Sequence, residues 1–243
     1  MLYMVKNVYK TSDSVKKRLP KGEDAQYQYT GMKINSHFLV CGPTGAGKSV
    51  VLFNYLLETS KPRNGTFDKV FVCYKTDEPL YEEMREQLKG NIHFYNDLQS
   101  FPSATDFADA IKQQEPEHYL VVFDDCVNDK DRNSEKKVEQ YFTFARKKNV
   151  TVCYLTQSFY KSPIFIRQQM KYLLLLDIQD ERELQMIMRT YGGMKKTPEQ
   201  IMEMFDDATT PRDADDLPFF KIACFKVPPA QKFSRDFIEY FDA

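Results

Sequence analysis

Residues 42–49 read Gly42-Pro43-Thr44-Gly45-Ala46-Gly47-Lys48-Ser49. Every fixed position of the G-x-x-x-x-G-K-[ST] phosphate-binding loop is filled. The glycines let successive backbone N–H groups converge on one anion, Lys48 reaches the β- and γ-phosphates, and the Ser49 hydroxyl ligates Mg²⁺. We therefore predict that the chain binds ATP and Mg²⁺, with nucleotide contacts from Gly42 through Val50.

Both flanks of this loop have the sequence that the motif requires. Phe38-Leu39-Val40-Cys41 is a short apolar run typical of a buried strand, and residues 50–57 continue as an apolar-rich helix. A strand, a loop and a helix N-terminus in this order form an anion site, because the helix dipole adds partial positive charge. The loop therefore predicts a fold as well as a ligand.

Strands alternate with helical stretches beyond the loop. Apolar, β-favouring runs predict strands at 68–74, 92–95, 119–123, 151–155, 172–176 and 219–225. Helical patterns lie at 79–88, 104–113, 134–148, 163–170, 181–191 and 198–205, with Pro79 at one helix start and Ser134 as the N-cap of another. This alternation implies right-handed crossovers. We predict an α/β fold with a mainly parallel central sheet and helices on both faces.

Length and composition fit one domain. The 243 residues suffice for one substantial core, and 28% charged with 42% hydrophobic residues is ordinary globular usage. We assign residues 1–36 to a polar, loosely packed N-terminal extension and residues from about 37 to 178 to the core. The remainder, from about 179 to 243, is assigned to C-terminal helices and a late strand.

The composition also bears on partners and location. A net charge of −1 argues against a broadly basic surface, so any contact with DNA has to come from a local patch or a pore lined by several subunits. The five cysteines and three histidines are scattered, with no zinc-binding spacing, and suit a reducing compartment. No apolar run reaches the ~20 residues of a membrane span, and the N-terminus lacks a signal-peptide core. We predict a soluble, intracellular protein without a membrane span.

Two acids follow the apolar strand at 119–123. In this position Asp124 is the Walker B carboxylate that holds Mg²⁺ opposite Ser49, and Asp125 orients or deprotonates the attacking water. A kinase that transfers phosphate to another substrate does not require the second carboxylate. Because ligands of parallel sheets sit beyond the carboxyl ends of the strands, the pair points to a hydrolytic site at that edge.

The next strand ends in Leu155-Thr156-Gln157-Ser158. The Gln157 amide is placed to touch both the γ-phosphate and the water, and thus to sense the phosphate. Arg146 and Arg167 lie on either side of this strand in sequence, and each is a candidate arginine finger for a neighbouring subunit's nucleotide. Each of the two also suits an ordinary surface or salt-bridged arginine.

With these motifs in order, the chain resembles the FtsK–HerA superfamily of P-loop ATPases, and within it the small genome-packaging ATPases of large DNA viruses, virophages and polinton-like elements. The resemblance rests on GPTGAGKS, on YLVVFDDC and on FARKKNVTVCYLTQSFYKSPIFIRQQM. It implies an ASCE-type, RecA-like core in which an extra strand separates the P-loop strand from the Walker B strand. Asp125 departs from the Glu that many relatives carry, and Lys147 from their His.

The resemblance further implies a homo-oligomeric ring, a pentamer or hexamer, that moves double-stranded DNA into a capsid with portal or vertex proteins as partners. The expected location is the host cytoplasm or virus factory, with association with the virion. Candidate pore loops are residues 128–133 and 158–162, the latter with Lys161. The alternatives are a cellular or plasmid DNA translocase or helicase, a P-loop nucleotide kinase, and a nucleotide-binding protein that does not hydrolyse ATP.

Overall fold

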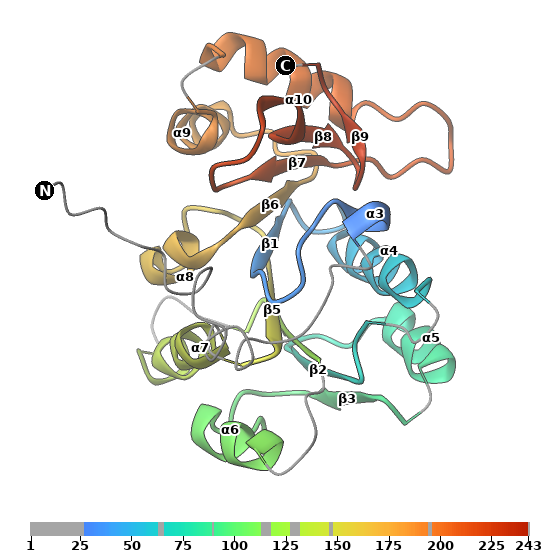
Figure 1. Cartoon of the computed structure of the whole chain (residues 1–243), viewed down its shortest axis with the longest axis vertical. Helices are drawn as coiled ribbons and strands as arrows, with labels where there is room; N and C mark the ends of the chain where they lie inside the picture. The colour runs from blue at the N-terminus through green and yellow to red at the C-terminus, as the bar shows by residue number, and fades with distance from the viewer. Residues whose placement is uncertain are drawn as a thin grey trace, which may run out of the picture.

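Figure 1 shows the computed structural model, which describes residues 27–62, 66–88, 90–112, 118–126, 132–145, 148–193 and 196–242. These residues form a nine-stranded sheet with the order β3-β2-β4-β5-β1-β6-β7-β8-β9. The strands are β1 (Phe38–Cys41), β2 (Lys69–Tyr74), β3 (Ile92–Tyr95), β4 (Tyr119–Asp124), β5 (Val150–Thr156), β6 (Tyr172–Leu175), β7 (Phe220–Ala223), β8 (Phe233–Arg235) and β9 (Glu239–Tyr240). The first six strands pair in parallel, and the last three are antiparallel.

Helices cover both faces of the parallel strands, as the alternation predicted (Figure 1). On one face lie α4 (Lys48–Ser60) and α5 (Pro79–Gln87), and on the other lie α6 (Ala104–Lys112), α7 (Arg132–Ala145) and α8 (Ile164–Gln169). Each face of the sheet has its own hydrophobic core, and alternate residues of a strand belong to different ones. Phe38 and Val40 pack toward α4, whereas Leu39 packs on the opposite face. Every residue of β1, β4, β5 and β6 is buried, which explains why these strands are mostly apolar.

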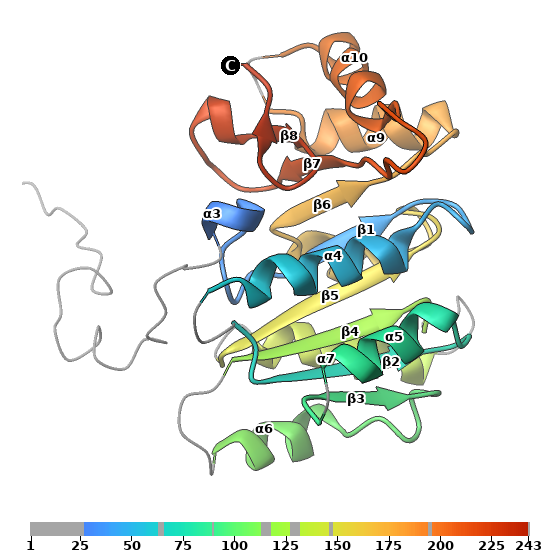
Figure 2. The ribbon, with the colours of Figure 1, turned by 90° about the vertical axis from the view of Figure 1, so that its right-hand side faces the viewer.

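The order of the strands confirms the extra strand that the resemblance implied. β5 lies between β1, which leads into the phosphate-binding loop, and β4, which ends in the acid pair. All three strands run in the same direction, so the segments that follow them meet at one edge, on the right in Figure 2. This carboxyl edge of the sheet is where the candidate site has to lie.

Several sequence expectations differ from the structure. α7 begins at Arg132, so Ser134 is its third residue and not its N-cap. The N-terminal segment is not loosely packed where it is described: α3 (Tyr27–Thr30) is followed by the buried Met32, and the Lys33 N–H donates to the Tyr172 hydroxyl at 3.1 Å. The division into an extension, a core and a C-terminal part remains a prediction.

The C-terminal part extends the sheet with the late strand that the sequence predicted, β7, and with two shorter strands, β8 and β9, that it did not indicate. After α9 (Glu181–Tyr191) and α10 (Pro198–Thr209) come β7, the 3₁₀ turn η1 (Pro229–Gln231), β8 and β9. The buried Arg235 ties these elements together, since its guanidinium donates to the carbonyls of Asp207 and Thr210 and to the Asp216 carboxylate. No helix in the described ranges is long and apolar enough to cross a membrane.

Lys221 is a buried lysine that joins α3 to the turn after β8. Its ammonium donates to the carbonyls of Thr30, at 3.0 Å, and Phe237, and it lies 5.1 Å from the centroid of the Tyr240 ring. Burial lowers the pKa of Lys221 from 10.5 to about 7. The charged form is therefore disfavoured in the folded protein relative to the unfolded chain.

This burial predicts a pH dependence of stability. Between about pH 7 and 10.5 the unfolded chain binds a proton at Lys221 that the folded protein has released, so the free energy of unfolding rises with pH. Between these pH values the free energy of unfolding of the wild type is expected to rise by up to a few kcal/mol relative to that of Lys221→Met. The reason is that a shift of one pKa unit corresponds to about 1.4 kcal/mol. Urea denaturation of both proteins at several pH values measures the difference, and parallel pH profiles would contradict it.

Candidate nucleotide site

The phosphate-binding loop connects β1 to the N-terminus of α4 at the carboxyl edge (Figure 2). Gly45 and Gly47 have φ angles of 81° and 89°, the left-handed region that other residues rarely adopt. Gly47 is the N-cap of α4 and supplies no side-chain acceptor, so first-turn N–H groups of this helix remain available to an anion. The Lys48 ammonium donates to the carbonyls of Gly42 and Pro43, both at 3.0 Å.

A loop from the C-terminal part lies against this segment. A Cβ atom on Gly47 would come within 2.4 Å of the Leu217 side chain, which belongs to the connection between α10 and β7. A Cβ atom on Gly42 would come within 2.9 Å of Leu176, directly after β6. The phosphate-binding loop is therefore packed on two sides: Gly42 has no room for a side chain beside Leu176, and a side chain at Gly47 would displace Leu217.

Asp124 ends β4 and is 8% exposed. Its Oδ2 accepts a hydrogen bond of 2.5 Å from the Tyr81 hydroxyl, and the nearby Ser49 side chain acts to lower the pKa of that hydroxyl. Burial, reinforced by the nearby charges of Glu78 and Asp125, raises the pKa of Asp124 to about 6, although the Tyr81 bond and Lys48 act in the opposite direction. Burial beside Asp124 also raises the pKa of Tyr81, so Tyr81 stays a neutral donor.

The residues present fit Mg²⁺. Asp124 accepts a hydrogen bond from the Tyr81 hydroxyl, and Ser49 is near enough to that hydroxyl to affect its pKa, so the two oxygen ligands proposed for the ion lie close together. Mg²⁺ prefers such oxygen ligands and usually completes its coordination with water and substrate phosphates. Among the described residues there is no group of three or more His, Cys, Asp or Glu side chains that could hold a metal. The phosphates of a bound nucleotide would supply further oxygen ligands for the ion.

Asp125 and Gln157 meet across neighbouring strands. The Gln157 amide nitrogen donates to Asp125 Oδ2 at 2.6 Å, and the Asp125 N–H donates to the Leu155 carbonyl at 3.1 Å. Asp125 has a φ angle of 50°, a left-handed conformation that turns the chain sharply after β4. The acid and the amide expected to handle the attacking water are thus in direct contact.

The turn after Gln157 is fixed by a residue that the sequence did not indicate. Glu183, 5% exposed on α9, accepts hydrogen bonds from the Ser158 hydroxyl at 2.8 Å and from the Tyr160 N–H at 2.9 Å. Nothing in the pattern of α9 marks this acid as buried. Tyr81 was equally missed, because its role depends on how α5 packs over β4.

The structure describes only some of the predicted arginine fingers and pore loops. Arg146 and most of the 128–133 loop lie outside the described residues, and Arg132 and Asn133 begin α7. Arg167 is on α8, where its Nε donates to the Ser162 carbonyl at 3.1 Å and its guanidinium lies 5.1 Å from the Phe159 ring centroid. The structure therefore places Arg167 against its own turn, and its role in a neighbour's site remains a prediction.

Comparison with known proteins gives the family. The family of the Schlafen group 3 DNA/RNA helicase domain matches residues 35–216, which include both acids, the phosphate-binding loop and Gln157. The chain belongs to this family. No curated protein is significantly similar in sequence.

Solved structures with a similar fold confirm the fold of this chain. Genome-packaging NTPase B204 of Sulfolobus turreted icosahedral virus 2, bound to ATPγS, has 11% identity and a TM-score of 0.50 over 84% of this chain and 98% of that one. Its complex with AMPPCP has 12% identity and a TM-score of 0.52 over 83% and 96%. The DNA-packaging ATPase B204 of Sulfolobus turreted icosahedral virus has 10% identity and a TM-score of 0.52 over 84% of this chain and 98% of that one. The expected resemblance to viral packaging ATPases is thus confirmed in the fold.

The geometry makes Tyr81 a positioning residue for Asp124. Its ring is held between Tyr74 and Phe94, with both centroid distances 5.3 Å, so Tyr81→Phe keeps the packing and removes only the donor. We expect the Mg²⁺ concentration for half-maximal binding of a fluorescent ATP analogue to rise about 10- to 100-fold. Binding in EDTA should not change. Tyr74→Phe, which removes a hydroxyl from the neighbouring ring, is the control, and an unchanged Mg²⁺ midpoint in Tyr81→Phe would refute the role.

Proposed function

We propose that this chain is an ATP-hydrolysing motor that translocates double-stranded DNA, and that its biological use is packaging a genome into a viral capsid. The observation that carries the proposal is the contact between Gln157 and Asp125 at the sheet edge that also holds the phosphate-binding loop. A simple nucleotide-binding protein has no need of that contact. Similarity in fold to B204, which is described as a DNA-packaging ATPase, supports the proposed use.

The proposed chemistry assigns each side chain one task. Lys48 leaves its two carbonyl partners and binds the β- and γ-phosphates, while Ser49 and Asp124 hold Mg²⁺. Asp125 accepts a proton from water as the water oxygen bonds to the γ-phosphorus. The bond between that phosphorus and the bridging oxygen breaks, and ADP leaves with the electron pair. Gln157 orients the water through its amide, whose nitrogen already lies 2.6 Å from Asp125.

The same contact supports a route from hydrolysis to movement. Gln157 is followed directly by the turn at 158–162, which Glu183 holds through two hydrogen bonds. Tyr160 and Lys161 are exposed on this turn. A change at Gln157 when the γ-phosphate departs would shift these side chains. They remain our candidates for contact with DNA phosphates.

The remaining parts of the proposal concern the assembly. A ring of five or six subunits would bring a neighbour's Arg146 or Arg167 toward the nucleotide, as arginine fingers do in related chemistry. Portal or vertex proteins of the capsid would hold the ring in place. The proposed location is the host cytoplasm or virus factory, and the virion.

A second function is favoured by the family match, which is to a DNA/RNA helicase domain. A helicase separates strands, whereas a packaging motor moves along an intact duplex. Displacement of a third strand from a triplex reports duplex translocation, and opening of a forked duplex reports unwinding. Fork opening without triplex displacement would favour the helicase.

Hydrolysis with and without DNA tests the proposal. We expect duplex DNA to raise the ATPase rate severalfold, and the effect to fall steeply with salt because phosphate contacts release counterions. Asp125→Asn is the matched control: it keeps the size of the side chain and nucleotide binding, and we expect kcat to fall about 10²- to 10⁴-fold. ATP turnover that duplex DNA never alters would argue against a DNA motor, and full turnover by Asp125→Asn would refute its role as base.

A further inference from the structure

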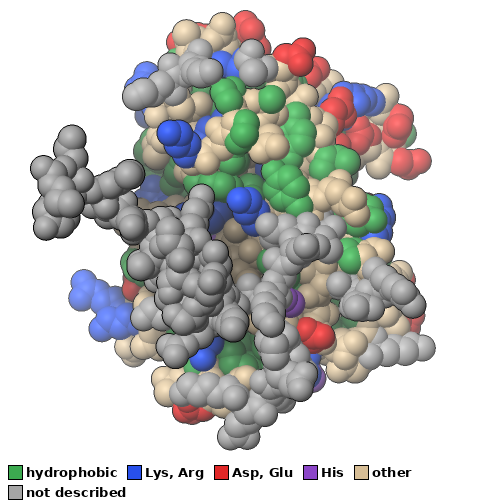
Figure 3. Space-filling model, in the orientation of Figure 1, with side chains coloured by type: hydrophobic (Ala, Val, Ile, Leu, Met, Phe, Trp, Pro, Cys, Tyr) green, Lys and Arg blue, Asp and Glu red, His purple; other side chains and the backbone are tan. Residues whose placement is uncertain are grey.

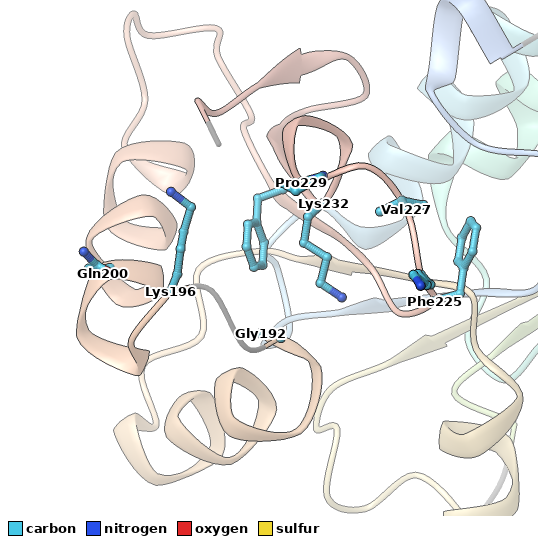
Figure 4. A pocket seen from close by; sticks show the side chains of 10 residues that line it. Gly192, Lys196, Gln200, Phe225, Val227, Pro229 and Lys232 are labelled. Atoms are coloured by element: carbon cyan, nitrogen blue, oxygen red, sulfur yellow. The ribbon is translucent and has the colours of Figure 1, made fainter.

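A cavity of about 780 Å³ lies far from the nucleotide site, between the α9–α10 connection and the β7–β8 hairpin (Figure 4). Three lysines line it, Lys196, Lys226 and Lys232, together with the aromatic rings of Phe225 and Phe233. None of the described residues that line it is acidic. We refer to it below as the basic pocket.

The positive charge of the basic pocket is not compensated within the described part of the chain. No described ion pair involves these lysines. Two further lysines converge on the pocket wall, since the ammonium groups of Lys33 and Lys171 each lie 5.9 Å from the Phe225 ring centroid. Burial lowers the pKa of Lys232, whose ammonium donates to the Ala223 carbonyl, so the pocket already carries a desolvation cost that an anion would offset.

The basic pocket lies at the amino edge of the parallel strands. The Cys224 N–H donates to the carbonyl of Lys171, the residue that precedes β6, at 2.7 Å. The opposite end of β7 begins at the loop that carries Leu217, which lies over Gly47 of the phosphate-binding loop. The two ends of β7 therefore face opposite edges of the sheet, so the basic pocket is separate from the nucleotide site.

The loop at the carboxyl edge carries the opposite charge. This loop comprises residues 211–217, and its Asp213 and Asp215 side chains are exposed. No described cation forms an ion pair with either carboxylate. The loop projects from the molecule between α10 and β7 in Figure 1, and acidic side chains gather there at the upper right of Figure 3. It is also preorganised, because Arg235 holds Asp216 at 2.5 Å and Arg212 pairs with Glu239.

We propose that the acidic loop at 211–217 of one copy docks into the basic pocket of the next copy, so that copies associate head to tail. The inference rests on the proposed ring and names its interface. Because the two surfaces lie on opposite edges of the same sheet, the contact is heterologous, and a heterologous contact generates a ring when its rotation closes. The pocket lysines of one copy would then lie next to the 211–217 loop of its neighbour, which contacts that neighbour's own phosphate-binding loop.

Three features favour a second copy over nucleic acid as the occupant. The site is a pocket that accepts a short projecting loop, whereas a duplex is a long rod that needs an extended surface. Its wall is partly apolar, with Phe225, Val227 and Pro229, and the loop supplies Pro211 and Ala214 as apolar partners. The pocket presents lysines and the loop presents exposed aspartates, and opposite charges on the two surfaces are what a head-to-tail contact requires.

A charge exchange tests the proposal. Lys226→Glu sets an acidic pocket against the acidic loop, and Asp215→Lys sets a basic loop against the basic pocket. By sedimentation velocity of the full chain at low salt with Mg²⁺ and AMPPCP, each is expected to weaken association about tenfold or more, since like charges meet. The double variant, and an equimolar mixture of the two single variants, should recover association because opposite charges meet again.

The control is Lys136→Glu, an exposed position on α7 with the same change in net charge as Lys226→Glu, which should associate as the wild type does. A monomeric wild type, unaltered association in both single variants, or failure of the double variant to recover would overturn the proposal. So would loss of affinity for fluorescent duplex DNA in Lys226→Glu with association intact. If the protein is monomeric and DNA still stimulates its ATPase, the proposed interface is wrong but the proposed motor stands. If the charge exchange restores association but ATP is not hydrolysed, the interface stands and the proposed motor is wrong.

Discussion

The site depends on β5 lying between the P-loop strand and the acid-bearing strand. The last two residues of β5 accept hydrogen bonds from both sides: the Thr156 carbonyl from the Gly42 N–H at 3.2 Å, and the Leu155 carbonyl from the Asp125 N–H at 3.1 Å. The next residue, Gln157, then stands between the phosphate-binding loop and Asp125. Because all seven residues of β5 are buried, this arrangement is supported by packing on both faces and does not depend on any single surface contact.

Several polar groups of the site are satisfied by contacts that ligands can replace. Lys48 donates to carbonyls of its own loop, and the Tyr81 hydroxyl donates to Asp124. An unpaired buried carboxylate would be costly, so the Tyr81 contact stabilises Asp124 in its position before nucleotide and metal arrive. The cost of binding is then an exchange of partners and not the ordering of a disordered loop.

Local sequence predicted the parts of the fold that depend on local patterning. The alternation of apolar runs and helical stretches located the six parallel strands, and the GPTGAGKS loop fixed the nucleotide edge. Tyr81 and Glu183 escaped prediction because their roles arise from the packing of α5 over β4 and of α9 beside the turn at 158–162, contacts between segments far apart in the chain. The strands β8 and β9 have three and two residues, too few for a periodic signal. The position of β5 came from the family resemblance, since residue spacing alone does not order strands.

The central claim is that one edge of the sheet gathers the phosphate-binding loop, the acid pair and Gln157 around ATP. A crystal structure of the protein with AMPPCP and Mg²⁺ measures this most directly. The account predicts that Lys48 moves from the carbonyls of Gly42 and Pro43 to the phosphates. It also predicts that the metal lies between Ser49 and Asp124, and that the Gln157 amide is within hydrogen-bonding distance of the γ-phosphate or its water. Phosphates bound away from Lys48, or a γ-phosphate out of reach of both Asp125 and Gln157, would contradict it.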